Sequence, residues 1–280
     1  MEIIHTIAAL KTLLAPLKAT SKIALVPTMG ALHKGHLSLI KLAQQETDIV
    51  ICSIFVNPTQ FTDPKDLEKY PRPLAHDIQL LEEVGCFAVF MPTVKEMYPS
   101  FPVPEDWHID LGEAEFVLEG EFRKGHYQGV TQIVKKLFDA VGPDTAFFGQ
   151  KDFQQVLMIK NMVSHFSLPI EIVSCPIVRE DDGLAMSSRN IHLSAQDRKN
   201  ALVLSRSLQY VKDHYGKESL GSLIDHARRQ INGIPGVELD YFTIADPNTL
   251  QPIKDQDHPH PVALVAAKVG ETRLIDNMLM

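Results

Sequence analysis

The stretch Ile23-Ala-Leu-Val-Pro-Thr-Met-Gly-Ala-Leu-His-Lys-Gly-His36 decides the fold. It opens with a short apolar run, and apolar residues recur at helical spacing between Leu39 and Ala43, which predicts a strand, a loop and the start of a helix. The N–H groups of a helix N-terminus lack partners within the helix and favour an anion. Gly30 and Gly35 allow sharp turns and let phosphate oxygens approach the backbone closely. The stretch therefore predicts a site for a nucleotide phosphate.

Two histidines of this stretch are candidates for the chemistry. His33 and His36 are three residues apart, so both can face one ligand if the first helical turn begins between them. An imidazole can donate a hydrogen bond to a phosphoryl oxygen. The segment is not a P-loop, because His36 and Leu37 follow Gly35 where that motif requires lysine and serine or threonine. A second Gly-x4-Gly-His occurs at residues 120–126, which shows how easily the bare spacing recurs by chance.

The composition describes a globular protein. Of 280 residues, 45% are hydrophobic and 22% are charged, so the chain can form one large or two ordinary domains, and we expect two. A formal net charge of -8 disfavours nucleic acid as a partner. No apolar run approaches the roughly 20 residues of a membrane span, so we expect no membrane partner.

Three scattered cysteines indicate the compartment. Cys52, Cys86 and Cys175 form no C-x-x-C pair, so they fit neither a disulfide framework nor a zinc site. We expect buried free thiols in a reducing cytoplasm. We expect no secretory signal either, because His5 and Lys11 interrupt the first apolar run.

The apolar patterns alternate between strand and helix along the first part of the chain. This alternation predicts an α/β class with a doubly wound parallel sheet, in which ligands gather beyond the carboxyl ends of the strands. Pro176 marks the expected domain boundary, and a capping box at Ser194 and Asp197 opens a helix of the second domain. The predicted strands are 23–26, 49–56, 86–91, 145–148, 170–174, 240–245 and 262–268, and the predicted helices are 77–84, 130–141 and 153–166.

Two further strand ends carry polar side chains. Gln60 follows the second strand at the same expected edge as His36, and its amide suits a small substrate with hydroxyls and a carboxylate, although Pro58 also allows an ordinary turn. After a third strand, Lys151 could stabilise charge on a leaving phosphate. Asp152 could orient a ribose or simply cap a helix.

A fourth segment is Met186-Ser-Ser-Arg189, which follows an acidic, glycine-containing stretch at residues 180–183 that we interpret as a mobile loop. Two hydroxyls and a guanidinium could close over a triphosphate from the second domain. A solvated loop leading to the Ser194 cap is the alternative.

The motifs Pro27-Thr-Met-Gly-Ala-Leu-His-Lys-Gly-His36, Phe55-Val-Asn-Pro-Thr-Gln-Phe61, Tyr70-Pro-Arg72, Gly149-Gln-Lys-Asp152 and Met186-Ser-Ser-Arg-Asn190 occur in this order. With them the chain closely resembles the pantothenate synthetase (pantoate–β-alanine ligase) family over most of its length. The resemblance implies a Rossmann-like nucleotidyltransferase domain at residues 1–176, with the ATP and pantoate site. A smaller α+β domain at residues 177–280 is implied to close over ATP. It further implies a homodimer that uses ATP and Mg²⁺.

In this family the carboxylate of pantoate is adenylated, pyrophosphate leaves, and the amine of β-alanine attacks the acyl adenylate to give pantothenate and AMP. The resemblance implies that Gln60 and Gln155 hold pantoate, with Gln60 also facing β-alanine, and it leaves the metal without an assigned side chain. The catalytic residues implied are His33, His36, Lys151 and Arg189, with His36 as proton donor. The implied ATP contacts are Met29, Gly30, His33, Gly35, His36, Gly149, Lys151, Asp152, Val178, Met186, Ser187, Ser188 and Arg189.

Two small departures from the family pattern fall outside these residues. Lys124 stands where the family often has proline, and Thr62 where glycine is common, so only local loop conformation is affected. Two other functions remain open. One is a nucleotidyltransferase with the same His-x-Gly-His motif acting on a different small acceptor, and the other is a nucleotide sensor without catalysis.

Overall fold

A computed structural model describes residues 1–280. The chain divides into two compact units. The first contains Met1–Gly149 and Gln155–Cys175, and the second contains Gln150–Gln154 and Pro176–Met280. The chain thus passes into the second unit at Pro176, and a short earlier segment also belongs to that unit.

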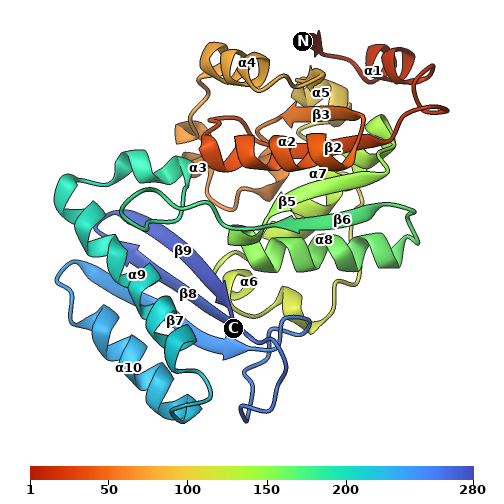
Figure 1. The fold of residues 1–280 in the computed structure, drawn as a ribbon. Coiled ribbons are helices and arrows are strands. Elements are labelled where there is room, and N and C mark those ends of the chain that lie inside the picture. The colour runs from red at the N-terminus through yellow and green to blue at the C-terminus, as the bar shows by residue number, and fades with distance from the viewer. The chain divides into compact units, whose positions relative to one another are not determined.

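The first unit is built on a six-stranded sheet with the order β1-β4-β3-β2-β5-β6, in which every pair of neighbours is parallel (Figure 1). The order reverses at β2, because the chain continues from β2 to β3 and β4 on one side and then crosses back to β5 and β6 on the other side. Ligands of such sheets bind at this switch point, beyond the carboxyl ends of the strands. The strands are β1 (Glu2–Ile4), β2 (Ile23–Thr28), β3 (Ile49–Ile54), β4 (Ala88–Phe90), β5 (Thr145–Gly149) and β6 (Glu171–Cys175).

Helices cover both faces of this sheet. Figure 1 shows α2 in front of the strands and α7 behind them. The helices are α1 (Ile7–Leu14), α2 (Lys34–Glu46), α3 (Pro64–Lys69), α4 (Leu74–Glu83), α5 (Val94–Met97), α6 (Glu119–Phe122), α7 (His126–Val141) and α8 (Phe153–His165), with the short 3-10 helices η1 (Pro58–Gln60) and η2 (Glu113–Glu115).

The apolar runs explain this architecture. Strand β3 reads Ile-Val-Ile-Cys-Ser-Ile and its first five residues are buried, as expected for a parallel strand covered on both faces. Alternate strand residues, among them Val26, Val50 and Phe147, pack against Leu39 and Ile40 of α2. The sheet therefore gives a rigid base from which the loops after β2, β3 and β5 emerge at one edge.

The second unit has its own core. Its antiparallel sheet has the order β7-β8-β9, and apolar residues of α9 and α10 share one buried cluster with it. Ser194 caps α9 by accepting a hydrogen bond from the backbone N–H of Asp197, as the sequence predicts. The elements are η3 (Gln150–Asp152), η4 (Ser188–His192), α9 (Ala195–His214), α10 (Leu220–Asn232), β7 (Val237–Ala245), β8 (Val262–Val269) and β9 (Thr272–Leu279).

The fold class is confirmed, and the predicted strands and helices all occur, with their ends shifted by a few residues. Helix α7 begins at His126, four residues before the predicted 130, because Gly125 in a left-handed conformation precedes its polar first turn. The sequence does not predict β1, which is only three residues long, nor α1, α3, α5, α6, α10, β9 and the short 3-10 helices. No helix of the structure is long and apolar enough to cross a membrane.

Candidate functional site

The two histidines form the N-terminal cap of α2. His33 is the N-cap residue, and its Nδ1 accepts a hydrogen bond from the backbone N–H of Gly35 at 3.1 Å. The Nδ1 of His36 accepts from the backbone N–H of His33 at 3.3 Å. The ring centroids lie 4.0 Å apart. The helix thus begins between the two histidines, which is the condition for both to face one ligand.

This cap determines where the histidines carry their protons. A ring nitrogen that accepts from a backbone N–H must present its lone pair, so Nδ1 is unprotonated in both rings. The proton of each neutral ring is then on Nε2. Both imidazoles are therefore prepared to act as hydrogen-bond donors through Nε2, beside a helix terminus that favours anions.

A buried carboxylate holds the loop that leads to these histidines. Asp77 on α4 is 1% exposed and accepts from the backbone N–H of Ala31 at 2.9 Å and of Leu32 at 2.7 Å. Burial raises the pKa of Asp77, and the two N–H donors act in the opposite direction. From the sequence, Asp77 is predicted only as the start of a helix, and no local pattern signals its contact with a loop about 46 residues earlier.

Gly30 is required where this loop passes the carboxylate. Its φ of +83° lies in the left-handed region, and a Cβ there would come within 2.9 Å of Asp77 Oδ2 and 3.0 Å of Ile54 Cγ2. A side chain would be strained by the backbone angle and would also collide with the anchor. The glycine is therefore a structural requirement of the loop, whatever else it contacts.

Gln60 lies at the same edge of the sheet as residues 29–33, the loop between β2 and α2, which we call the histidine loop. Because β2 and β3 are parallel neighbours, the loops that follow them emerge together. Gln60 is 7% exposed, and its Nε2 lies 3.3 Å from the sulfur of Met29, while its Oε1 accepts from Asn57 Nδ2 at 3.2 Å. The amide is thus fixed beside the loop that carries His33 and His36.

Asn57 organises the surroundings of Gln60. It is 1% exposed, donates to the carbonyl of Gly129 at 3.0 Å and accepts from the hydroxyl of Tyr98 at 2.8 Å. A Cβ on Gly129 would come within 2.4 Å of the carbonyl oxygen of Thr59, so this glycine lets α7 pack directly on η1. Asn57 lies within one of the sequence motifs, but the sequence alone assigns it no role.

The end of β5 carries the next predicted residues. Strand β5 pairs with β2, so Gly149 lies at the same edge as the histidine loop. Gln155 is half-buried on α8 and also belongs to the first unit. Lys151 and Asp152 belong instead to the second unit, where Lys151 Nζ lies 3.7 Å from Asp152 Oδ1.

Residues 178–186 form a tight hairpin. The N–H of Met186 donates to the carbonyl of Val178 at 3.0 Å, so the structure brings together two predicted residues that are separated in the sequence. Gly183 closes the turn with a φ of +94°. The expected loop is therefore present as the turn of a hairpin, which backbone hydrogen bonds close and charged side chains hold.

Three ionic groups secure this hairpin. Arg198 bridges Glu180 at 2.7 Å and Asp182 at 2.9 Å, and Asn190 donates to Glu180 at 2.9 Å. The hydrogen bond from Arg198 holds the pKa of Glu180 below its usual value. Ser187 then caps η4 by accepting from the N–H of Arg189, and Ser188 and Arg189 are half-buried in that turn.

The predicted residues thus fall into two sets, one in each unit. The first unit holds the set around the carboxyl ends of β2, β3 and β5. The second unit holds the η3 segment and the 178–189 segment. The first set is Met29, Gly30, His33, Gly35, His36, Gln60, Gly149 and Gln155, and the second is Lys151, Asp152, Val178, Met186, Ser187, Ser188 and Arg189.

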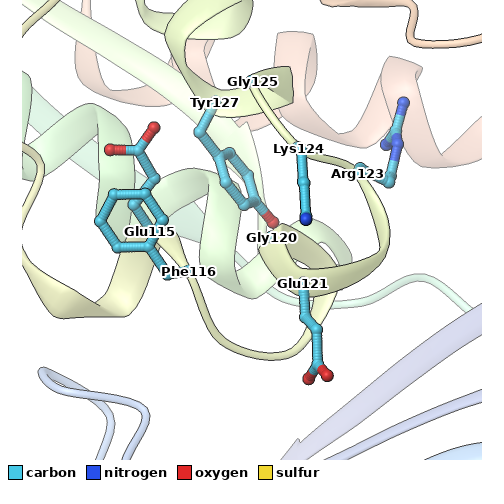
Figure 2. A pocket seen from close by; sticks show the side chains of 8 residues that line it. All are labelled: Glu115, Phe116, Gly120, Glu121, Arg123, Lys124, Gly125 and Tyr127. Carbon is cyan, nitrogen blue, oxygen red and sulfur yellow. The ribbon is translucent and has the colours of Figure 1, made fainter.

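A hollow of about 260 Å³ lies elsewhere in the first unit. Figure 2 shows Glu115 and Phe116 on one side of Tyr127, and Lys124 and Arg123 on the other. None of the predicted site residues lines it. Lys124, one of the two departures from the family pattern, therefore points to this hollow and not to the strand ends.

Metal-binding and redox groups are sparse. The structure contains no group of three or more His, Cys, Asp or Glu side chains that could hold a metal ion. All three cysteines are free and buried, as expected from the sequence. Burial raises the pKa of Cys86 and of Cys175 to about 11, so both thiols are protonated at neutral pH.

Comparison with protein families gives one match over almost the whole chain. The model of the pantoate-beta-alanine ligase family matches residues 2–279. A pantothenate synthetase from Porphyromonas gingivalis is 47% identical over 280 residues, which cover 99% of both chains. A pantothenate synthetase from Bacteroides thetaiotaomicron is also 47% identical, over 99% of this chain and 98% of its own.

Solved structures agree with these matches. The pantothenate synthetase of Thermus thermophilus superposes with a TM-score of 0.92 at 40% identity, over 99% of both chains. The pantoate-beta-alanine ligase of Francisella tularensis superposes with a TM-score of 0.81 at 35% identity, over 100% of this chain and 97% of its own. That structure is described as a complex with beta-gamma ATP and β-alanine.

Proposed function

The chain belongs to the pantoate-beta-alanine ligase family of enzymes, and we propose that it joins pantoate to β-alanine in two half-reactions driven by ATP. In the first, a carboxylate oxygen of pantoate attacks the α-phosphorus of ATP and pyrophosphate leaves. In the second, the amine of β-alanine attacks the acyl carbon of pantoyl adenylate, loses a proton and displaces AMP. The product is the amide pantothenate.

The histidine cap has the chemistry that the first half-reaction needs. Negative charge develops on the α-phosphate and on the departing pyrophosphate, and donors fixed in advance stabilise such charge most effectively. His33 and His36 supply Nε2–H donors, and the N-terminus of α2 adds its partial positive charge. We assign to His36 the proton-donor role of the family, in which its Nε2–H donates a hydrogen bond to a phosphate oxygen.

The amides of Gln60 and Gln155 suit the acid substrate. Pantoate carries hydroxyl groups and a carboxylate, and an amide can donate to the one and accept from the other. Gln60 is held by Asn57 and Met29 and so presents its amide in one orientation beside the ATP loop. We assign Gln60 and Gln155 to pantoate, with Gln60 also facing β-alanine.

The second unit supplies the remaining cations and hydroxyls. We assign Lys151 and Arg189 to charge stabilisation on the triphosphate, with Asp152, Val178, Met186, Ser187 and Ser188 as further ATP contacts. We propose that residues 177–280 form the part that closes over ATP. Closure would keep water from the acyl adenylate, which hydrolysis would otherwise destroy.

Magnesium fits this scheme as the partner of ATP. Mg²⁺ keeps several waters and commonly binds through substrate phosphates and one or two carboxylates, so it needs no cage of protein side chains. The side chains of this chain offer no such cage. We therefore propose that ATP and water provide most of its ligands, and we assign it no side chain. A homodimer and a cytoplasmic location also remain predictions.

The observation that carries this proposal is the cap of α2, in which both Nδ1 atoms are occupied by backbone donors. One assay tests it. With ATP, Mg²⁺ and pantoate alone, the enzyme should release pyrophosphate in an amount close to the enzyme concentration, and AMP and pantothenate should appear only after β-alanine is added. Pyrophosphate release that requires a different acceptor would indicate another nucleotidyltransferase, and ATP binding without release would indicate a sensor.

A further inference from the structure

Two adjacent residues of β9 connect to two segments that the sequence places far apart. Asp276 is 4% exposed and Asn277 is 2% exposed. Neighbours in a strand point to opposite faces of the sheet, so the two side chains reach in opposite directions. Asp276 lies on the same face of β9 as Leu274 and Met278, which both belong to the apolar core of the second unit.

Asn277 holds the η3 segment by its backbone. Its Nδ2 donates to the carbonyls of Gln150 and Lys151, each at 2.9 Å, and its Oδ1 accepts from Gln150 Nε2 at 3.1 Å. Both ends of the amide are therefore used on consecutive residues. Asn277 fixes the course of the backbone at Lys151 while leaving the ammonium group of that lysine available for other contacts.

Asp276 holds the 178–186 hairpin. Arg179 forms two parallel hydrogen bonds with its carboxylate, at 2.7 and 3.0 Å, and also donates to the carbonyl of Gly183 at 3.2 Å. The N–H of Asn277 donates to Asp276 Oδ1 at 2.8 Å, which fixes the carboxylate against its own strand. A two-pronged pair of this kind sets orientation as well as distance.

Stability alone does not explain the pair between Arg179 and Asp276. A buried ion pair can often be replaced by apolar residues without loss of stability, because desolvation offsets the attraction. Asp276 interrupts an otherwise apolar face between Leu274 and Met278. The orientation that Asp276 imposes on the side chain of Arg179 better explains why a carboxylate occurs at this position.

We propose that Asp276 and Asn277 are positioning residues for ATP, which set the spacing between the Lys151 segment and the Met186–Arg189 segment. This inference rests on the proposed function, because that function assigns both segments to ATP. Neither side chain is required to touch the nucleotide. Asn277 holds the backbone at Lys151 on one face of the sheet, and Asp276 holds the hairpin through Arg179 on the other face.

The test compares kinetic constants of Asn277→Ala and Asp276→Asn with those of the wild-type enzyme. Asp240→Asn is the matched control, because Asp240 pairs with Arg273, on the same strand as Asp276, at 2.7 Å and lies outside both segments in the sequence. We expect Asn277→Ala to lower kcat/KM for ATP about tenfold or more, from the loss of hydrogen bonds to two carbonyls. Asp276→Asn should lower it several-fold, and the KM for β-alanine should change in neither variant.

The outcomes separate this inference from the proposed function. If the wild-type enzyme makes pantothenate but both variants keep its kcat/KM for ATP and lose only unfolding temperature, Asp276 and Asn277 are structural and the inference is wrong. The inference would also be wrong if Asp240→Asn lowered kcat/KM for ATP as much as the two variants do. If the wild-type enzyme makes no pantothenate, the proposed function fails first. Should Asn277→Ala not fold, the isosteric Asp276→Asn variant decides the question.

Discussion

The histidine loop and the 178–186 hairpin are both assigned to ATP, yet they are held in place by different forces. The histidine loop is fixed by hydrogen bonds from backbone N–H groups to one buried carboxylate, Asp77, and by a glycine that admits no side chain. The hairpin is fixed by ion pairs, one from Arg179 to the buried Asp276 and one between Arg198 and Glu180, whose side chains are about one-third exposed. The first arrangement suits a preorganised site, and the second suits a segment that adjusts when ATP binds.

The largest effect should come from removing charge-stabilising groups assigned to ATP, one beside the histidine loop and one on the η3 segment that Asn277 holds. His36→Ala and Lys151→Ala should each lower kcat about a hundredfold or more, because each removes a donor to charge in the transition state. Steady-state pyrophosphate release measures this. Lys34→Ala, on the exposed first residue of α2, should leave kcat unchanged. Near-native turnover of either variant would remove that residue from the mechanism.

The anchor of the first region is tested by Asp77→Ala. One buried and one partly buried backbone N–H group would lose their acceptor, and the expected loss in the free energy of unfolding is about 2–4 kcal/mol. Turnover of the folded fraction should also fall, because the loop before His33 would lose its fixed course. Urea denaturation and kcat measured on the same preparation check both effects. A variant of native stability would mean that the loop does not depend on this carboxylate.

Low pH should destabilise the hairpin but not the histidine loop. The folded pKa of Glu180 lies below its unfolded value, so the stability that it contributes is complete above the unfolded pKa, near pH 4.5, and is lost as pH falls through the folded pKa. The pKa of Asp77 is raised, so acid relieves a burial penalty there instead. Hydrogen exchange near pH 4 and below should therefore show the hairpin opening before the histidine loop, and Glu180→Gln should remove this difference.

The adjustable character of the hairpin predicts a response to substrates. Adding ATP and pantoate should slow hydrogen exchange at residues 183–189 several-fold more than at residues 29–33, if the segment closes over the nucleotide. The same exchange experiment without pantoate is the control. Unchanged exchange at residues 183–189 would contradict closure.

The smallest effect concerns the cysteines. Because burial raises the pKa of Cys86 and Cys175 to about 11, native protein at pH 8 should react with a thiol reagent far more slowly than unfolded protein. A rapid reaction of one equivalent in the native state would show that one thiol is accessible.

The two regions also differ in how far sequence could predict them. The β2-loop-α2 unit follows from local pattern, because an apolar run, two glycines and helical spacing all lie within about twenty residues. For the hairpin, local pattern predicts only a loop, because its structure depends on contacts of Arg179 with Asp276 and of Arg198 with Glu180. Asp77, Asn57 and Asn277 were missed for the same reason. Each acts across a distance in sequence that only the folded chain reveals.

The central claim is that the carboxylate of pantoate attacks the α-phosphorus of ATP at this site. Pantoate labelled with ¹⁸O in both carboxylate oxygens tests it most directly, with β-alanine and ATP added to the wild-type enzyme and the products analysed by mass spectrometry. We predict that AMP acquires one ¹⁸O atom and that pantothenate retains the other. Unlabelled AMP, or label in inorganic phosphate together with ADP, would contradict the claim.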